Sequence, residues 1–374
     1  MSKKIIWCGN SYYGSPFKVG CNYYSEILSK QGNKVLFISP PVSPFHNRKE
    51  NRVRFEQARK GIVEVFDNYF VYTPYTILPP VKRLPLWLSC ITNNWHRFTI
   101  PNLSKVIREV GFEDVDILVI DYFSFLPLVS FIKYEKLIVR VTDNLSGFNV
   151  GGAALKAEKL LIKMADKVVV TSHRLINYAK SFNSNVIYVS NGVDFNKFQG
   201  RFKKPEIFSK INEPVAIYIG AIDVWFDFDL LEYVSNILKN VHFLIVGPVK
   251  NTSKNFNRLK GKRNVTFLGG IDNSLVPNYL FYASVGIIPF RKDMPLVQTV
   301  SPLKLYEYMA CGLPVVSSEW EEIRNVDSPA YLCKTEGEFV KNIKRALKDK
   351  NKEKYINFAR KNDWKEKLKL LLSE

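Results

Sequence analysis

Short apolar runs rich in Val, Ile and Leu alternate along the chain with longer stretches whose apolar residues recur at helical spacing. In the first half the runs are residues 5–9, 35–39, 117–120, 137–141, 168–171 and 186–189. In the second half they are residues 215–220, 242–247, 265–269, 285–290 and 314–317. This alternation is typical of βαβ units that build a parallel sheet. The pattern predicts two similar α/β halves.

The length of the chain supports two domains, because 374 residues exceed the size of one ordinary hydrophobic core. Residues 195–214 carry Lys, Arg, Gly and Pro with little periodicity, which is typical of a linker. We therefore predict an N-terminal domain at 1–204 and a C-terminal domain at 205–348. The charged segment 349–374, with apolar residues at helical spacing, is expected to form a terminal helix.

Composition indicates a folded protein with an acidic partner. Hydrophobic residues make up 46% and charged residues 24%, which excludes a disordered or fibrous chain. The net charge of +19 indicates nucleic acid, an anionic membrane surface or a phosphorylated substrate as a partner, and charge alone does not choose among them.

Cysteine usage and hydropathy indicate a cytoplasmic protein. The five cysteines are scattered and show no C-x-x-C spacing, so neither a disulfide framework nor a zinc site is expected. The first strand begins too early for a signal peptide, and no apolar run approaches the roughly 20 residues of a membrane-spanning helix. Membrane association is expected to be peripheral.

Residues 72–102 break the α/β alternation by mixing apolar and aromatic residues, among them Trp87 and Trp95, with basic ones. This composition is typical of an interfacial membrane segment or a lipid-acceptor groove. A loop and helix that pack on the N-terminal core explain it equally well.

The most informative motif spans residues 301–316, SPLKLYEYMACGLPVV. Ser301 followed by proline predicts an N-cap and a first helical position, and Gly312 predicts the end of the helix before a buried strand. The predicted helix covers about residues 302–311.

Two charged residues on this predicted helix indicate a ligand. Lys304 lies near the helix start, where its charge opposes the positive end of the helix dipole, so an anion is expected there. Free N–H groups, the Ser301 hydroxyl and the Lys304 ammonium would suit a diphosphate, and Glu307, one turn later, would suit a ribose. An exposed Lys304–Glu307 surface pair is the alternative that spacing alone leaves open.

This segment resembles the donor-binding segment of GT-B glycosyltransferases in the large family-four-like group, especially bacterial polysaccharide enzymes such as the xanthan glucuronosyltransferase and the teichuronic acid transferases. Further matching segments occur in the same order along nearly the whole chain. They are 165–172 (ADKVVVTS), 190–194 (SNGVD) with Phe198, 218–220 (YIG), 246–248 (VGP), 267–269 (FLG) and 288–290 (IPF).

The resemblance implies two Rossmann-like domains whose parallel sheets face a central cleft, and a terminal helix that crosses back to the N-terminal domain. The donor-site residues that it implies are Ser301, Leu303, Lys304, Glu307, Gly269 and Ile271. Among them, Glu307 would bind the ribose, Lys304 and the amides at the helix start the diphosphate, and the last two would lie beside the base. Arg291 is a candidate for additional charge near the diphosphate, or a solvated residue.

The chain departs from the pattern of many retaining relatives at two places. Thr299 stands where they carry a first glutamate, and residues 221–227 lack the cation that many carry after the first strand of this domain. An inverting mechanism, which needs a carboxylate base, is therefore favoured. Asp143, at the end of the predicted strand 137–141, is the expected base, with Asp121 as the second choice and a capping role as the alternative.

On the acceptor side, the loop after the first strand carries glycines that allow close approach to the backbone. Its candidate acceptor-binding residues are Tyr13, Gly14 and Asn22. The sequence Asp227-Phe-Asp229 imitates a metal-binding motif but is expected to cap a helix, so neither a metal nor a cofactor is expected.

Together these features predict a glycosyltransferase that moves a sugar, hexosyl or uronosyl, from a nucleoside diphosphate donor, expected to be UDP-linked, to a saccharide acceptor. The acceptor is expected to be lipid-linked and the enzyme to lie at an anionic membrane surface on its cytoplasmic face, in polysaccharide biosynthesis. A retaining enzyme of the same fold is one alternative. A basic nucleic-acid-binding protein is another, but it leaves Lys304 and Glu307 unexplained.

Overall fold

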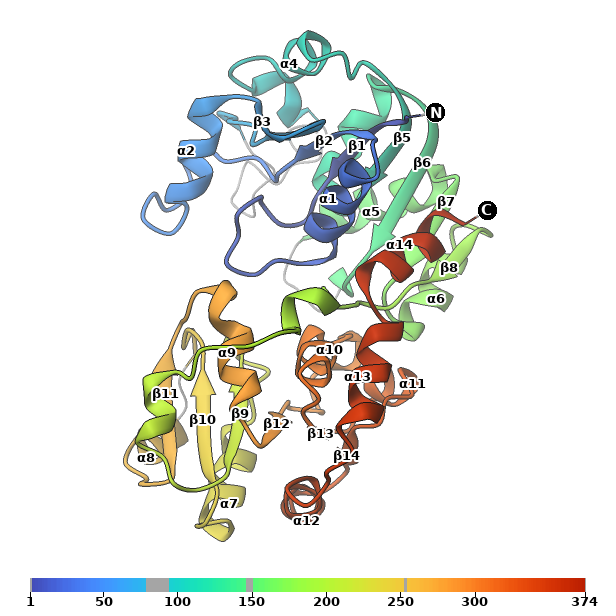
Figure 1. Cartoon of the computed structure of the whole chain (residues 1–374). Helices are drawn as coiled ribbons and strands as arrows, with labels where there is room; N and C mark the ends of the chain where they lie inside the picture. The colour runs from blue at the N-terminus through green and yellow to red at the C-terminus, as the bar shows by residue number, and fades with distance from the viewer. Residues whose placement is uncertain (1, 79–93, 146–150, 252–253, 374) are drawn as a thin grey trace. The chain divides into compact units, whose positions relative to one another are not determined.

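The computed structural model describes residues 2–78, 94–145, 151–251 and 254–373. The chain divides into two compact units, Met1–Val189 with Leu368–Glu374 and Ser190–Lys367 (Figure 1). Each unit has its own sheet and its own hydrophobic core. The predicted pair of α/β halves is confirmed.

The division between the units lies at Val189/Ser190, earlier than the boundary at 204/205 that the linker composition predicts. The intervening residues pack into the second unit, because Phe198 belongs to its core and the Gln199 side chain donates to the carbonyl of Ala310 at 3.0 Å. Polar composition here marks a surface segment rather than a linker.

The sheet of the first unit has eight strands in the order β3-β4-β2-β1-β5-β6-β7-β8. All neighbouring pairs are parallel except β3–β4. The strands are β1 Lys4–Cys8, β2 Lys34–Ile38, β3 Val63–Phe66, β4 Tyr69–Tyr72, β5 Asp114–Ile120, β6 Lys133–Val141, β7 Lys167–Val170 and β8 Val186–Tyr188. The hydropathy pattern misses β3 and β4, because β3 is almost wholly exposed and β4 is short and aromatic.

Helices accompany this sheet along the chain. They are α1 Gly20–Lys30, α2 Arg52–Lys60, α4 Leu103–Glu109, α5 Gly152–Met164 and α6 His173–Lys180, with the 3-10 helices η1 Trp95–Phe98 and η2 Phe123–Ser130. Trp95 is fully buried and its Nε1 donates to the Ser124 carbonyl at 2.5 Å, so of the two interpretations of this segment, packing on the N-terminal core describes Trp95 and an interfacial position does not. Trp87 lies outside the described residues.

The sheet of the second unit is wholly parallel, in the order β11-β10-β9-β12-β13-β14. Its strands are β9 Val215–Ile219, β10 His242–Val246, β11 Val265–Gly269, β12 Val285–Ile288, β13 Val315–Ser318 and β14 Tyr331–Cys333. Its helices are α7 Phe228–Ile237, α8 Lys254–Lys260, α9 Val276–Phe281, α10 Leu303–Ala310, α11 Glu321–Asn325, α12 Glu336–Ala346 and α13 Lys352–Lys361, with the 3-10 helices η4 Phe195–Phe198, η5 Glu206–Ser209, η6 Asn273–Leu275 and η7 Val297–Thr299.

The C-terminal segment forms two helices, α13 and α14 (Trp364–Leu372), where one was predicted. The break lies at residues 362–363, where the Asp363 carboxylate accepts from the Phe195 N–H and the Trp364 N–H donates to the Val193 carbonyl. These bonds to residues 193–195 replace the intrahelical bonds that would join the two helices. Among the helices in the described ranges, none is both long and apolar enough to cross a membrane.

The order of each sheet reverses beside its first strand. In the first sheet β1 lies between β2 and β5, and in the second β9 lies between β10 and β12. In open parallel sheets ligands bind beyond the carboxyl ends of the strands at such a reversal. Binding and catalytic residues are therefore expected directly after β1, β5 and β6 in the first sheet and after β9 and β12 in the second.

Candidate active site

The predicted donor helix is α10, and it begins one residue later than the sequence indicates. Pro302, not Ser301, is the N-cap, with an extended backbone at φ −77° and ψ 119°. Ser301 is buried, its carbonyl accepts from the Asn191 side chain at 2.8 Å, and its hydroxyl lies 3.5 Å from the Tyr306 hydroxyl. The predicted capping role of Ser301 is thus wrong, because its side chain points into the unit. A helix leaves its first N–H groups without acceptors within the helix, and the amide of Leu303, the first residue of α10, is one of these.

Lys304 reaches from the first turn of α10 to the end of β9. Its Nζ lies 5.2 Å from the centre of the Tyr218 ring and 5.4 Å from that of Phe290, which follows β12. The ammonium therefore occupies the reversal of the second sheet. Burial lowers its pKa to about 8, and the Glu307 carboxylate only partly opposes this shift. Among the described residues the rings of Tyr218 and Phe290 lie against this half-buried ammonium and supply no full negative charge, so an anion bound here would stabilise its charged form.

Two glycines make room for the Lys304 side chain. Gly220 has φ +148°, and a Cβ there would lie 2.7 Å from the Lys304 Nζ. Gly247, at the end of β10, has φ +146°, and a Cβ there would lie 2.6 Å from the Gly220 carbonyl carbon. Both backbone conformations favour glycine, and any side chain would push this lysine or the neighbouring strand aside.

Glu307 lies one turn after Lys304 and is half-buried. Burial raises its pKa, and the Lys197 and Lys304 ammonium groups oppose that rise. Lys197, from η4, also donates to the Asn273 side chain in the segment that follows β11. The predicted alternative of an exposed Lys304–Glu307 surface pair does not describe this site, because both side chains are half-buried and the lysine turns toward Gly220.

The residues expected beside the base lie at the end of β11. Gly269 has φ +83° and its carbonyl accepts from the Gly247 N–H at 2.7 Å, while the half-buried Ile271 packs against the core of the unit. Arg291 is exposed and pairs with Asp293 at 3.1 Å. The Asp227 side chain caps α7 through the Leu230 N–H at 2.9 Å, as the sequence predicts.

Asp143, the expected base, follows β6 and lines a cavity of about 230 Å³ in the first unit. Burial raises the pKa of its carboxyl, and the Thr142 hydroxyl, which donates to it at 3.2 Å, opposes that rise. The same hydroxyl oxygen accepts from the Asn10 amide at 3.0 Å, in the loop after β1. A carboxylate held by one hydroxyl beside an open space is suited to accept a proton.

Asp121, the second choice of base, is not placed for that role. It lines the same cavity, but its Oδ2 lies 2.5 Å from the Arg140 Nη1 and accepts from the Trp7 Nε1 at 3.2 Å. The side chains of this ion pair are 0% and 2% exposed. A carboxylate bound to a buried guanidinium is a weak proton acceptor, and the pair anchors β5 to β6 instead.

The three acceptor-side candidates lie in different surroundings. The carbonyl of Tyr13 accepts from the Gln57 amide of α2 at 2.7 Å, and Gly14, at φ +74°, is exposed beside it. Asn22 is only 2% exposed, and its Oδ1 accepts from the Val19 N–H at the start of α1. The structure brings Tyr13 and Gly14 together and sets Asn22 inside the fold.

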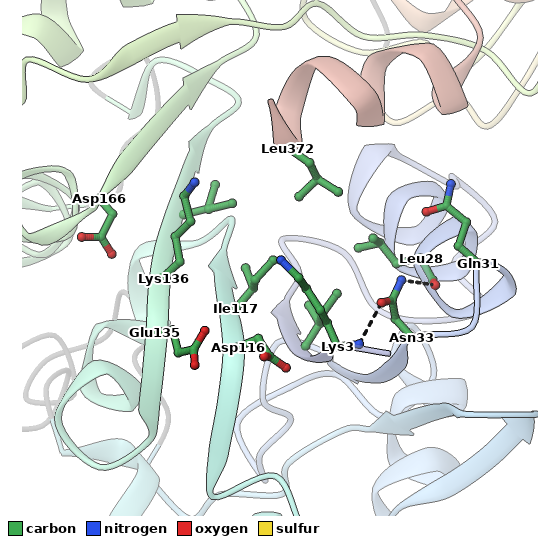
Figure 2. A pocket seen from close by; sticks show the side chains of 12 residues that line it. Lys3, Leu28, Gln31, Asn33, Asp116, Ile117, Glu135, Lys136, Asp166 and Leu372 are labelled. Carbon is green, nitrogen blue, oxygen red and sulfur yellow. Dashed lines mark hydrogen bonds between the residues drawn. The ribbon is translucent and has the colours of Figure 1, made fainter. Parts of the chain in front are cut away.

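A larger cavity of about 530 Å³ lies at the opposite edge of the first sheet (Figure 2). Lys3, Asp116, Glu135 and Lys136 line it at the amino ends of β1, β5 and β6, and Leu372 of α14 points toward it. None of the predicted site residues lines it, and ligands of parallel sheets bind at the carboxyl edge.

Sequence reasoning missed three residues beside the predicted ones: Lys197, Asn10 and Glu158. Lys197 lies three residues after the S-N-G-V-D segment 190–194. That segment is one of those that match the glycosyltransferase pattern in order, and this match was the available signal for a role of Lys197 at the donor helix. Asn10 belongs to the glycine loop after β1. Glu158 lines the Asp143 cavity from α5, and its position within an apolar stripe of that helix was the only signal.

Two family models match the chain in order. Glucuronosyltransferase GumK, N-terminal domain, matches residues 6–171, and Glycosyl transferases group 1 matches residues 213–349. The first match ends within the first unit and the second lies wholly within the second unit.

One curated relative is TuaH of Bacillus subtilis (strain 168), a glycosyltransferase assigned to teichuronic acid biosynthesis. It is 29% identical over 223 residues, which cover 56% of each chain. The match thus spans about half the length of that relative.

Solved structures share the fold over the whole chain. A glycosyltransferase from Rickettsia africae covers 100% of this chain and 99% of its own, at 13% identity and a TM-score of 0.66. HepE from Anabaena, solved in complex with UDP-glucose, covers 99% and 98%, at 15% identity and a TM-score of 0.66. The UDP-forming trehalose-phosphate synthase from Burkholderia xenovorans covers 100% and 98%, at 11% identity and a TM-score of 0.67. These likenesses confirm the predicted GT-B fold.

Proposed function

We propose that this chain, which is a glycosyltransferase of the GT-B type resembling GumK and the teichuronic acid transferases, moves a sugar from a nucleoside diphosphate to a saccharide acceptor. The observation that carries the proposal is the position of Lys304, which extends from the start of α10 to Tyr218 and Gly220 at the end of β9. A half-buried cation at a helix N-terminus and at the reversal of a parallel sheet is suited to a diphosphate.

In the proposed donor complex the diphosphate lies against Lys304 and the Leu303 amide. Glu307 accepts hydrogen bonds from the ribose hydroxyls, and Lys197 keeps this carboxylate ionised. The nucleobase of the donor lies near Gly269 and Ile271. Uracil is the proposed nucleobase, because HepE, which shares the fold, was solved with UDP-glucose.

Asp143 is the proposed base of an inverting reaction. It takes the proton of the acceptor hydroxyl while that oxygen bonds to the anomeric carbon, and the bond from this carbon to the diphosphate oxygen breaks on the opposite face. The departing nucleoside diphosphate carries away the electron pair. Thr299 supports inversion over retention, because its buried hydroxyl is bonded to the Leu296 carbonyl and supplies no carboxylate.

The proposed acceptor is lipid-linked, and a surface of the first unit supports it. A bridge pairs Thr76 with Thr99, both buried, and the residues on either side of them, Tyr75, Ile77, Phe98 and Ile100, are more exposed. Beside them Arg52 and Arg59 of α2 and Arg48 before it, together with Glu56, which pairs with Arg52, line a cavity of about 560 Å³. This arginine–aromatic surface consists of Arg48, Arg52, Arg59, Tyr75, Ile77, Phe98 and Ile100. Basic and apolar side chains in one place suit an anionic membrane surface on the cytoplasmic side.

A flotation assay with anionic vesicles tests the membrane proposal. The double variant Ile77→Ser/Ile100→Ser removes apolar side chains that are 47% and 57% exposed, so binding should fall without loss of stability. Val224→Ser, at a side chain 40% exposed in the second unit, is the matched control. Equal flotation of the double variant and the wild type would contradict the proposal.

A panel of sugar nucleotides tests the transfer proposal. Thermal shift identifies the donor, because a ligand at about 100 times its Kd adds about 2.7 kcal/mol to the free energy of unfolding. Release of the nucleoside diphosphate then measures turnover, and proton NMR of the product gives its anomeric configuration. Asp143→Asn should lower turnover about 10²- to 10⁴-fold and keep the thermal shift, whereas Asp114→Asn, at the exposed start of β5, should change neither.

Retention of the anomeric configuration would remove Asp143 from the base role. Near-wild-type turnover of Asp143→Asn would do the same. A flat thermal response to every nucleotide in the panel would reject the donor site itself.

A further inference from the structure

Glu158 is a carboxyl group where the helix pattern calls for an apolar side chain. Its neighbours on the inward stripe of α5, Ala154, Ala157, Leu161 and Ile162, are all buried. Glu158 itself is only 9% exposed. A buried carboxyl group destabilises the folded state unless it is hydrogen-bonded, paired or protonated. The presence of Glu158 at this position therefore suggests a function.

Among the described residues, one oxygen of the Glu158 carboxyl group is hydrogen-bonded and the other is not. Its Oε1 accepts from the Tyr178 hydroxyl of α6 at 2.7 Å. Its other oxygen has no hydrogen-bond partner among the described residues, and the side chain lines the 230 Å³ cavity that Asp143 also lines. A carboxyl group that lines this cavity with one oxygen left for a further hydrogen bond is positioned to bind a ligand that enters it.

Among the described residues that line the cavity, no cation is left unpaired beside the two carboxyl groups. Arg140, the cation among its lining residues, is bound to Asp121 at 2.5 Å. Among the described residues, the titratable or charged groups that act on Glu158 are Asp143 from the loop after β6, Tyr178 from α6 and Lys159 on its own helix. Asp121 and Arg140 from the sheet and Tyr122 before η2 line the same cavity.

The balance of these groups favours the neutral form of Glu158. Burial and then the Asp143 carboxylate raise its pKa to about 7, against the opposing effects of Tyr178 and Lys159. When two carboxyl groups share a small buried space, ionisation of one disfavours ionisation of the other. Asp143 and Glu158 are thus expected to differ in protonation at neutral pH.

We propose that Glu158 is an acceptor-binding residue that carries a proton in the resting enzyme and donates a hydrogen bond from its neutral carboxyl group to an oxygen of the saccharide acceptor. The neutral carboxyl also leaves Asp143 as the ionised member of the pair, free to take the proton of the reacting hydroxyl. This inference rests on the proposed transfer reaction and adds a second contact to its acceptor side.

The pH dependence of kcat/KM for the acceptor tests the proposal. Wild-type kcat/KM should fall above about pH 7 as Glu158 ionises. Glu158→Gln keeps a neutral donor and should lose this fall, with a plateau within about tenfold of the wild type. Tyr178→Phe removes the bond that lowers the pKa of Glu158, so it should move the fall to higher pH. Glu113→Gln, an exposed residue of the same unit, is the matched control and should keep the wild-type profile.

Two kinetic outcomes would overturn the inference. Loss of turnover in a folded Glu158→Gln that still binds the acceptor would make Glu158 the ionised base. A wild-type pH profile in both Glu158→Gln and Tyr178→Phe would leave Glu158 without a role.

An infrared measurement separates this inference from the proposed function, because it needs no turnover. At about pH 6 the wild type minus Glu158→Gln difference spectrum should contain the carbonyl stretch of a protonated carboxyl group, and at about pH 9 that of a carboxylate. A carboxylate signal at both pH values would overturn the inference even if the enzyme is active. Absence of turnover with every sugar nucleotide, together with the protonated signal, would instead reject the proposed reaction. If Glu158→Gln does not fold, the Tyr178→Phe profile decides.

Discussion

Binding of a diphosphate should change the protonation of Lys304, and this change can be measured. Burial places the pKa of Lys304 at about 8 in the free protein. A bound diphosphate favours the charged form, so the pKa should return to at least the ordinary lysine value of about 10.4. At a pH between these two pKa values, binding of the nucleotide is coupled to uptake of a proton by Lys304. UDP is the probe in the experiment that follows from this linkage.

The size of the effect follows from the two pKa values. With a free-state pKa of about 8, Lys304 is about nine-tenths protonated at pH 7 and about one-tenth protonated at pH 9. The affinity for UDP should therefore fall about tenfold over this range, or about 1.4 kcal/mol. At pH 9 about 0.9 proton should be taken up for each UDP bound.

Isothermal titration in buffers of different ionisation enthalpy measures this proton uptake directly. Lys304→Arg keeps a charge that does not titrate in this range, so its affinity should vary less with pH. Lys304→Met should bind UDP weakly and without proton uptake. Because all three proteins meet the same UDP, ionisation of the nucleotide cancels in their comparison. Equal pH dependence in the wild type and Lys304→Arg would refute the placement of the diphosphate at Lys304.

Three further variants test the donor site and the scaffold beneath it. Glu307→Gln should weaken UDP binding about 10- to 100-fold by calorimetry, because charge-assisted hydrogen bonds contribute about 1.5–3 kcal/mol. The control Glu336→Gln, at an exposed residue, should bind UDP as the wild type does. Equal affinities of Glu307→Gln and the wild type would show that Glu307 does not bind the ribose. Gly247→Ala should lower the free energy of unfolding in urea by at least about 1–2 kcal/mol, because its φ of +146° and the adjacent Gly220 carbonyl exclude a side chain. The control Gly152→Ala, where no atom lies within 4 Å of the added Cβ, should be neutral or stabilising. Arg140→Met should cost about 3–5 kcal/mol in the same assay, because it leaves its carboxylate partner buried without a counter-charge, and a loss below 1 kcal/mol would show that the pair does not hold the sheet.

The helix that carries the donor site could be predicted because its signals are local. The charged residues Lys304 and Glu307, the end at Gly312 and the buried strand after it lie within one short segment, and the structure shows α10 there with Gly312 at φ +69°. The exact start could not be predicted. Ser301 resembles an N-cap in sequence, but the bond from Asn191 fixes its backbone from a distant segment and turns its side chain inward.

Residues brought to the site from distant segments left weaker signals. Lys197 meets Glu307 only because η4 packs on α10, which no periodicity reveals. Glu158 is one polar residue in an apolar stripe, which sequence alone does not distinguish from an exposed neighbour. Asp121 and Asp143 look alike in sequence, each following a strand, and only the contact with Arg140 separates a scaffold carboxylate from a candidate base.

The most direct test of the donor site is hydrogen–deuterium exchange of the wild-type chain with and without UDP. A diphosphate on the first turn of α10 and a base beside β11 should slow exchange in peptides that cover residues 299–308 and 268–274. Peptides that cover β1 and the amino end of β5 should exchange at the same rate in both samples. Protection confined to the first unit, or no protection at saturating UDP, would contradict the assignment of α10 as the nucleotide site.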